Sequence, residues 1–213
     1  MAWFGLSRPP LPAEPVRMKI PLFPLDTVLF PGGVLPLKIF EQRYLDMTKV
    51  CIRDNSPFGV CLIRDGGEVG APAVPYPVGC TARIVEWDMP HLGMFHLLCR
   101  GESVFRIVEH WSARNGLVSA VVEVREPVLR DPLPDRFREL RELLGRIVEK
   151  LGEENFPSPV MLDDADWVAC RLSESLPLDP EVKQQLLEAP DAQARLEQLA
   201  ELLKDKSVTI GGR

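Results

Sequence analysis

The hydrophobic period of the sequence changes from two residues to about 3.6 near residue 130, and this change constrains the fold more than any other feature. Before it, short apolar runs separated by turn residues have the alternation of strands with one buried face. After it, apolar residues recur at helical spacing along Phe137–Leu151. The sequence therefore predicts an α+β fold, in which a β-rich pseudo-barrel amino-terminal domain with one helix is followed by a helical bundle.

The strand pattern is clearest in residues 80–87. There the odd-numbered residues, which are Thr81, Arg83, Val85 and Trp87, alternate with the even-numbered residues, which are Cys80, Ala82, Ile84 and Glu86. This alternation predicts one buried and one exposed face. A single helix is expected over Glu41–Arg53, and an Asn-Ser-Pro turn follows it. The predicted strands are Met18–Phe23, Val34–Ile39, Phe58–Ile63, Cys80–Trp87, Met94–Arg100, Val104–Trp111 and Leu117–Val124.

Aspartates mark the starts of the predicted helices, because a short carboxylate side chain accepts hydrogen bonds from the first free backbone N–H groups. Pro180 fits the first turn of the third helix, and Pro177 ends the one before it. The expected capping residues are Asp135, Asp163 or Asp164, Asp179 and Asp191.

These patterns divide the chain into four parts. We expect a flexible proline-rich arm over 1–17, a β-rich domain over 18–130, a helical bundle over 131–205 and a tail over 206–213. The 21 prolines lie mostly in the first two thirds of the chain and follow no period, which favours many turns and edge strands over a low-complexity segment.

The charge distribution argues against nucleic acid and anionic membranes as partners. Residues 1–130 hold fourteen Lys/Arg against thirteen Asp/Glu, whereas residues 131–213 hold eleven against eighteen. Neither part has the basic stripe that phosphate binding requires.

The five cysteines form an odd set without a Cys-x-x-Cys pair, so we expect them to be buried as small apolar side chains in a reducing compartment. The sequence has neither the pattern of a signal peptide nor an apolar window long enough for a membrane span, and the expected location is the cytoplasm.

Motifs for catalysis are missing from the sequence. No glycine precedes a lysine, which excludes the usual phosphate-binding loop, and neither Gly-x-Ser-x-Gly nor His-Glu-x-x-His occurs. The carboxylate pairs Glu153/Glu154 and Asp163/Asp164 fit helix ends better than acid/base chemistry. We therefore expect no catalytic residue, no metal ligand and no cofactor.

One long segment of the sequence carries a more specific signal than these general patterns. Residues 20–44 read Ile-Pro-Leu-Phe-Pro-Leu-Asp-Thr-Val-Leu-Phe-Pro-Gly-Gly-Val-Leu-Pro-Leu-Lys-Ile-Phe-Glu-Gln-Arg-Tyr. This run strongly resembles the opening of the substrate-binding amino-terminal domain of the Lon protease family. Further matching segments lie at 58–63, 68–70, 78–84, 101–107, 176–178 and 183–188, so that the resemblance covers about residues 18–205.

In full-length Lon proteases this domain precedes a long helical section, an ATPase module and a Ser-Lys peptidase domain, and the 213 residues match none of these. The resemblance therefore implies a stand-alone, non-catalytic module that recognises unfolded or extended polypeptides. It implies possible cooperation with a separate protease or chaperone, and edge strands would permit self-association.

An extended peptide would add to a sheet edge or lie in an apolar groove between the β-rich domain and the bundle. The residues predicted to contact it are Phe40, Arg43 and Tyr44 at the helix start and Trp87 near a hairpin tip. Under the alternative interpretation, Phe40 and Tyr44 are core residues, and Glu41 pairs with Arg43.

A second hypothesis is a small-molecule sensor or a cryptic hydrolase on the same scaffold. It requires an enclosed pocket with convergent polar groups, for which His91, His96 and Cys99 are the candidates.

Overall fold

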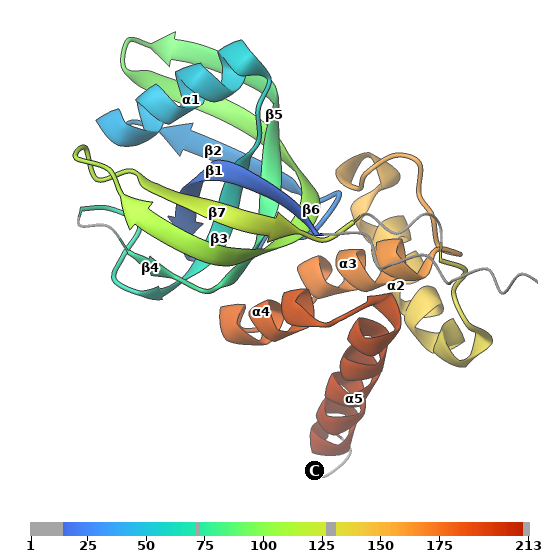
Figure 1. The fold of residues 1–213 in the computed structure, drawn as a ribbon. Helices are drawn as coiled ribbons and strands as arrows, with labels where there is room; N and C mark the ends of the chain where they lie inside the picture. The colour runs from blue at the N-terminus through green and yellow to red at the C-terminus, as the bar shows by residue number, and fades with distance from the viewer. Residues whose placement is uncertain (1–14, 71–72, 127–130, 211–213) are drawn as a thin grey trace, which may run out of the picture.

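The computed structural model describes residues 15–70, 73–126 and 131–210, and side chains of the last helix as far as residue 204. A closed sheet with one helix makes up the first part, and helices packed beside it make up the second (Figure 1). The strands are β1 (Val16–Leu25), β2 (Val34–Ile39), β3 (Phe58–Asp65), β4 (Val74–Pro75), β5 (Val78–His91), β6 (Met94–Ser112) and β7 (Val118–Val124). The helices are α1 (Gln42–Asp54), α2 (Arg138–Leu151), α3 (Ala165–Ser175), α4 (Pro180–Glu188) and α5 (Ala192–Ile210), with short 3₁₀ turns at Asp135–Phe137 and Glu153–Asn155.

The sheet closes on itself as the predicted pseudo-barrel. Its strands follow the order β1-β7-β6-β5-β3, and the parallel pairing of Leu22–Leu25 with Gly59–Leu62 joins β3 back to β1. Two further strands lie outside this ring, because β2 pairs with the first half of β6 and β4 pairs with the end of β3. The α+β fold class is therefore confirmed.

Strand β6 differs from the prediction, because it continues through the Gly101–Ser103 segment that the sequence indicated as a turn. The pairing of β5 with β6 shifts register at this point, between Cys80 and Ala82. Such an irregularity bends a strand without ending it, so two predicted strands form one. The short strand β4 was not predicted.

The alternation predicted for residues 80–87 is wrong. Val78–Ala82 are buried on both faces, whereas Val85–His91 are exposed on both. The first half of β5 faces the barrel interior on one side and α4 on the other, where Gln184 donates a hydrogen bond to the Val78 carbonyl at 3.0 Å. The second half extends beyond the barrel as a hairpin with β6 (Figure 1).

The helix starts agree only in part with the predicted caps. The Asp164 carboxylate accepts the backbone N–H of Trp167 at 2.8 Å, and Asp191 accepts that of Ala194 at 2.8 Å. Asp135 instead begins a 3₁₀ turn that precedes α2, and its side chain makes no capping hydrogen bond. Asp179 precedes Pro180 as predicted but makes none either.

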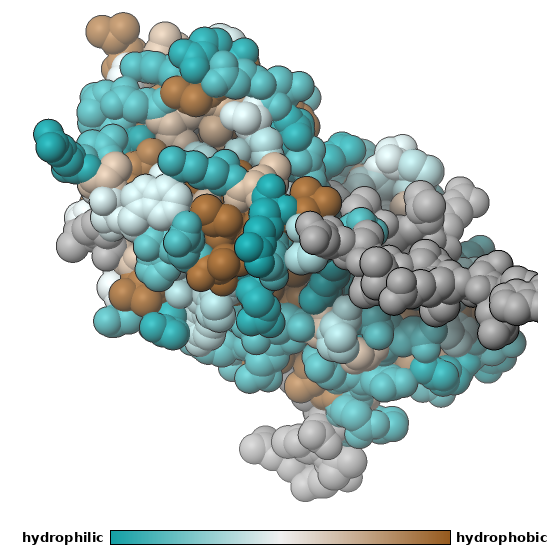
Figure 2. Space-filling view, viewed as in Figure 1, coloured by the Kyte–Doolittle hydropathy of each residue, from teal (hydrophilic) through white to brown (hydrophobic). Residues whose placement is uncertain are grey.

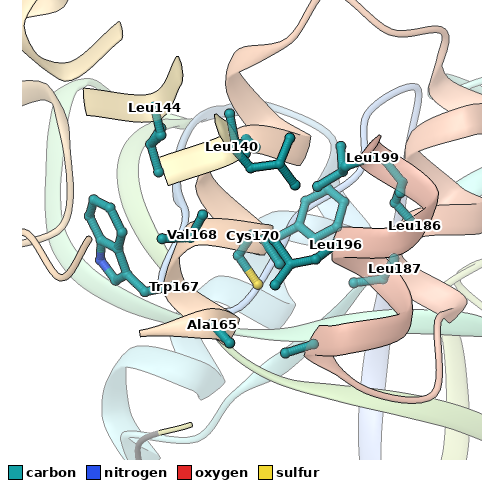
Figure 3. Packing of buried hydrophobic residues seen from close by; sticks show 14 of the residues in the cluster. Leu140, Leu144, Ala165, Trp167, Val168, Cys170, Leu186, Leu187, Leu196 and Leu199 are labelled. Atoms are coloured by element: carbon teal, nitrogen blue, oxygen red, sulfur yellow. The ribbon is translucent and has the colours of Figure 1, made fainter. Parts of the chain in front are cut away.

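One buried cluster joins the sheet to the helices. From the sheet side it includes Phe30, Leu62, Val78 and Val104, and helices α2 to α5 provide most of its other members. Figure 3 shows side chains of α2, α3 and α5 meeting in this cluster. A second cluster packs α1 against the sheet, and a third joins side chains of β1, β3, β6 and β7. All five cysteines are buried and free, as expected.

The predicted domain boundaries remain predictions. Residues 1–14 of the expected arm and residues 127–130 at the expected junction lie outside the described residues, while Val16 and Arg17 belong to β1. Helix α5 runs on to Ile210, into the expected tail. None of the described helices combines the length and apolarity needed to cross a lipid bilayer.

Candidate functional site

The ring of strands leaves an opening beside β2, because β1 changes its partner halfway along its length. Val16–Pro21 pair with β7, whereas Leu22–Leu25 pair with β3. β2 pairs with β6 along Val34–Ile39, and no other described strand pairs with its second edge. Residues from the end of β1 and from β2 border one open cleft, which we name the β1–β2 cleft.

The β1–β2 cleft has a volume of about 160 Å³ and is mostly apolar. Buried Tyr44 of α1 meets Phe23 of β1 edge to face, with ring centroids 4.2 Å apart. The Glu68 carboxylate accepts the backbone N–H of Asp26 at 2.8 Å, which ties the loop after β3 to the end of β1. The cleft is lined by Phe23, Leu25, Pro36, Leu37, Lys38, Ile39, Phe40, Glu41, Tyr44, Glu68 and Val69.

Pro36 explains why β2 stays at the edge of the sheet. A proline has no backbone N–H to donate, so it is tolerated where one side of the strand remains unpaired. The same missing donor weakens the edge as a template for pairing with another sheet. A segment that occupies the β1–β2 cleft would therefore depend on apolar side-chain contacts as well as on backbone hydrogen bonds.

The structure brings two of the four predicted peptide-contact residues together in this cleft. Phe40 is 56% exposed at its border, and Tyr44 is buried inside it. Arg43 is buried outside the lining, where its guanidinium pairs with Glu41 at 2.9 Å, as the alternative interpretation expected. Trp87 is 54% exposed on the β5–β6 hairpin and stacks edge to face on Phe95, away from the cleft.

Tyr44 is a titratable residue of the cleft lining whose pKa is shifted by burial. Burial raises the pKa of the Tyr44 hydroxyl, an effect that nearby Arg43 partly opposes. The hydroxyl therefore stays protonated near neutral pH. The other titratable side chains of the lining are Lys38, Glu41 and Glu68, which belong to β2, the start of α1 and the loop after β3.

The residues of the sensor or hydrolase hypothesis do not gather around a pocket. His91 and His96 are exposed on the β5–β6 hairpin, whereas Cys99 is fully buried. Burial also raises the pKa of Cys99 to about 12, which suppresses the reactive thiolate. In the part of the chain that the structure describes, no group of three or more His, Cys, Asp or Glu side chains has metal-binding geometry.

The boundary between sheet and helices differs from the apolar groove that we expected. Here the described residues form a pocket of about 100 Å³ whose lining includes Arg125, Asp166 and Arg195. Arg195 pairs with Asp166 at 3.1 Å, and Arg125 donates to the carbonyl oxygen of Ala189 at 2.8 Å. This pocket is small and charged, and Val104 and Ala192 of the shared core belong to its lining.

Sequence reasoning missed several residues of the β1–β2 cleft, among them Leu25, Leu37 and Val69. Pro36 was the available signal, because a proline inside a strand pattern indicates an edge. On the face shown in Figure 2, hydrophobic residues are exposed in separate patches framed by hydrophilic ones. The side chains that face a cleft cannot be told from core residues by hydrophobicity alone.

The closed sheet, its attached helices and the open cleft define an α+β domain with a surface site. The chain belongs to the family described as the ATP-dependent protease La (LON) substrate-binding domain, whose model matches residues 19–205. The family suggested by residues 20–44 is therefore confirmed.

Curated relatives include a Lon protease of Anaeromyxobacter dehalogenans and Lon protease 2 of Myxococcus xanthus. Each is 31% identical over 206 residues, which cover 91% of this chain and 24% of the relative. The chain thus spans about a quarter of the length of these relatives.

Two solved structures share the fold. A Lon N-terminal domain protein from Xanthomonas campestris has a TM-score of 0.74 and 38% identity, and the match covers 86% of this chain and 98% of that one. The N-terminal domain of a Mycobacterium avium complex Lon protease has a TM-score of 0.64 and 21% identity, and covers 88% and 99% of the two chains.

Proposed function

We propose that this chain is a non-catalytic polypeptide-recognition module, and that it holds extended segments of other proteins in the β1–β2 cleft. The main observation that supports this proposal is that an unpaired strand edge and an apolar lining occur in the same open cleft. Strand edges and alternating side-chain pockets are a common way to bind extended peptides. Membership of a family described by substrate binding supports the same function.

The natural occupants in this proposal are unfolded or extended polypeptides, which a separate protease or chaperone would process further. The apolar walls offer contact to alternate side chains of such a segment, and Lys38, Glu41 and Glu68 provide polar groups in the same lining. Because the lining contains no paired nucleophile and base, the cleft supports holding a chain and not cleaving it.

Titration with short peptides from an unfolded protein tests this function. In isothermal calorimetry we expect saturable binding of apolar, extended peptides. Phe40→Ala should weaken it by roughly tenfold, because the lost apolar contact is worth roughly 1.4 kcal/mol. Leu151→Ala is the matched control, since Leu151 is 53% exposed at the end of α2, outside the cleft lining.

Two outcomes would count against the proposal. The first is a lack of saturable binding by the wild-type chain across the peptide set. The second is equal weakening by Phe40→Ala and Leu151→Ala, which would indicate unspecific hydrophobic contact. Peptides made of consecutive prolines give a further control, because none of their residues has the backbone N–H that an added strand donates.

A further inference from the structure

The turn that precedes β2 is held from two sides. From the sheet, Gly101 of β6 accepts the N–H of Gly32 at 2.8 Å and donates its own N–H to the carbonyl oxygen of Gly33 at 2.9 Å. From the helices, Arg171 of α3 donates to the carbonyl oxygen of Pro31 at 2.6 Å. Gly32 has a φ of +76°, which favours glycine and makes the turn sharp.

Arg171 depends on Glu174 for charge compensation. Arg171 is 1% exposed, and its Nε lies 3.1 Å from an oxygen of the Glu174 carboxylate. Among the described residues, Glu174 is the one acidic side chain within ion-pair distance of Arg171. Neither Nε nor Nη1 of Arg171 forms a hydrogen bond there, so Glu174 acts through its charge. A buried guanidinium without its carboxylate is costly, so the contact with Pro31 relies on this pair.

Glu174 also packs directly against the turn. A Cβ atom added to Gly33 would overlap Oε1 of Glu174, so the carboxylate occupies the space above this glycine. Lys183 of α4 donates to the backbone carbonyl of Glu174 at 2.9 Å, which connects a second helix to the same place. Strand β2 begins at the residue after Gly33 and continues into the β1–β2 cleft.

We propose that Arg171 and Glu174 are positioning residues for the β1–β2 cleft: by holding the Pro31–Gly33 turn, helix α3 sets the free edge of β2 and thereby the affinity of the cleft for polypeptide. This inference rests on the proposed function. It makes the helical part a regulator of a site that it does not touch, because none of the lining residues comes from α2–α5. A partner that displaces α3 would weaken binding without occupying the cleft.

Two variants test the positioning role at one fixed pH above about 7, where the carboxyl group of Glu174 is ionised. Glu174→Gln keeps the size of the side chain and removes the charge that Arg171 needs. Gly33→Ala is the second variant, because its Cβ displaces the Glu174 carboxylate from the turn. The matched control is Glu197→Gln on α5. It removes the same charge from an ion pair with Arg136 in which both side chains are exposed.

The readouts are peptide affinity by calorimetry and amide hydrogen exchange of residues 34–39, both well below the unfolding temperature. We expect each test variant to weaken peptide binding about three- to tenfold and to speed exchange in β2, while β3 and β7 keep wild-type protection. Glu197→Gln should change neither readout.

A test variant that lowers the unfolding temperature but keeps wild-type affinity and wild-type exchange in β2 overturns the inference, because the pair is then merely structural. If the wild-type chain itself binds no peptide, the proposed function fails. In that case exchange alone decides whether α3 positions β2, so the two failures are distinguishable.

Discussion

Charged side chains are buried where the helices meet the sheet. Besides Arg171, Arg195 of α5 is 2% exposed, pairs with Asp166 at 3.1 Å and donates to the carbonyl oxygen of Leu186 at 2.7 Å. Its guanidinium also lies over the Phe30 ring, 5.7 Å from the centroid. Arginine in an amphipathic helix is normally exposed, so neither residue could be recognised from the sequence. Each of them has at least one partner that is distant in the chain, which is the Pro31 carbonyl for Arg171 and Asp166 for Arg195.

Gly101 is the glycine whose replacement should be most informative about the barrel. A Cβ there would collide with the carbonyl oxygen of Phe30, and a backbone atom cannot move aside like a side chain. We expect Gly101→Ala to lower the free energy of unfolding by roughly 1–3 kcal/mol in urea denaturation. Gly67→Ala is the control, because a Cβ at Gly67 meets nothing within 4 Å. If Gly101→Ala and Gly67→Ala lowered the free energy of unfolding equally, this explanation would be contradicted.

Glu174 should make stability depend on pH. Burial raises the pKa of its carboxyl group to about 7, although Arg171, the Phe30 backbone and Lys183 favour the ionised form. The folded chain therefore binds this proton more tightly than the unfolded chain, whose pKa is near the usual 4.5. The contribution of Glu174 to stability is fully present below pH 4.5 and is lost as the pH rises through about 7.

We expect Glu174→Gln to flatten the pH dependence of the free energy of unfolding in this window, relative to the wild-type chain. The measurement is urea denaturation at a series of pH values between the two pKa values. An unchanged slope in the variant would show that another group carries the effect.

At the scale of elements, the sequence predicted most of the strands and all of the long helices. Periodicity was sufficient for α1, which was expected over Glu41–Arg53 and is found over Gln42–Asp54. It failed for β5, because burial on both faces depends on α4, whose Gln184 contacts Val78 of β5 from 106 residues further along the chain. Local turn signals also failed at Gly101, which serves close packing within a continuous strand.

The candidate site was predictable to a smaller extent. Of the predicted contact residues, Phe40 and Tyr44 are part of the cleft lining, whereas Arg43 and Trp87 lie outside it. The cleft itself depends on the partner change of β1, and pairing between distant strands cannot be read from a local pattern.

The cap of α3 distinguishes two neighbouring carboxylates that the sequence left as alternatives. Asp164 accepts the backbone N–H of Trp167 at 2.8 Å, whereas the side chain of Asp163 is exposed and pairs with Arg141. We expect Asp164→Ala to lower the free energy of unfolding by about 1 kcal/mol, and Asp163→Ala to change it much less. Thermal unfolding followed by circular dichroism compares the two variants, and a larger loss for Asp163→Ala would refute the assignment of the cap.

At the scale of the whole molecule, the two parts share a core and should unfold together. The cluster that contains Val104 of the sheet and Phe30 of the loop between β1 and β2 also contains Leu144, Val168 and Leu196 of the helices. Removing either part would expose these apolar side chains, at roughly 25 cal/mol for each Å² of apolar surface. The sheet and the helices are therefore expected to form one cooperative unit, although they look separate as ribbons (Figure 1).

The five thiols can measure this cooperativity residue by residue. Cys51 lies in α1, Cys61, Cys80 and Cys99 lie in the sheet, and Cys170 lies in α3, so both parts carry a buried probe. Burial raises the pKa of Cys99 and of Cys170 to about 12, so that neither reacts as a thiolate while the chain is folded.

We expect all five thiols to be alkylated at one common rate, equal to the rate allowed by global unfolding, when modified peptides are followed by mass spectrometry. Added urea should accelerate the five reactions by the same factor, because each then requires exposure of the same surface. Faster modification of Cys170 than of Cys61 and Cys80 would mean that the helices detach while the barrel stays folded, and the shared core would then not couple the two parts.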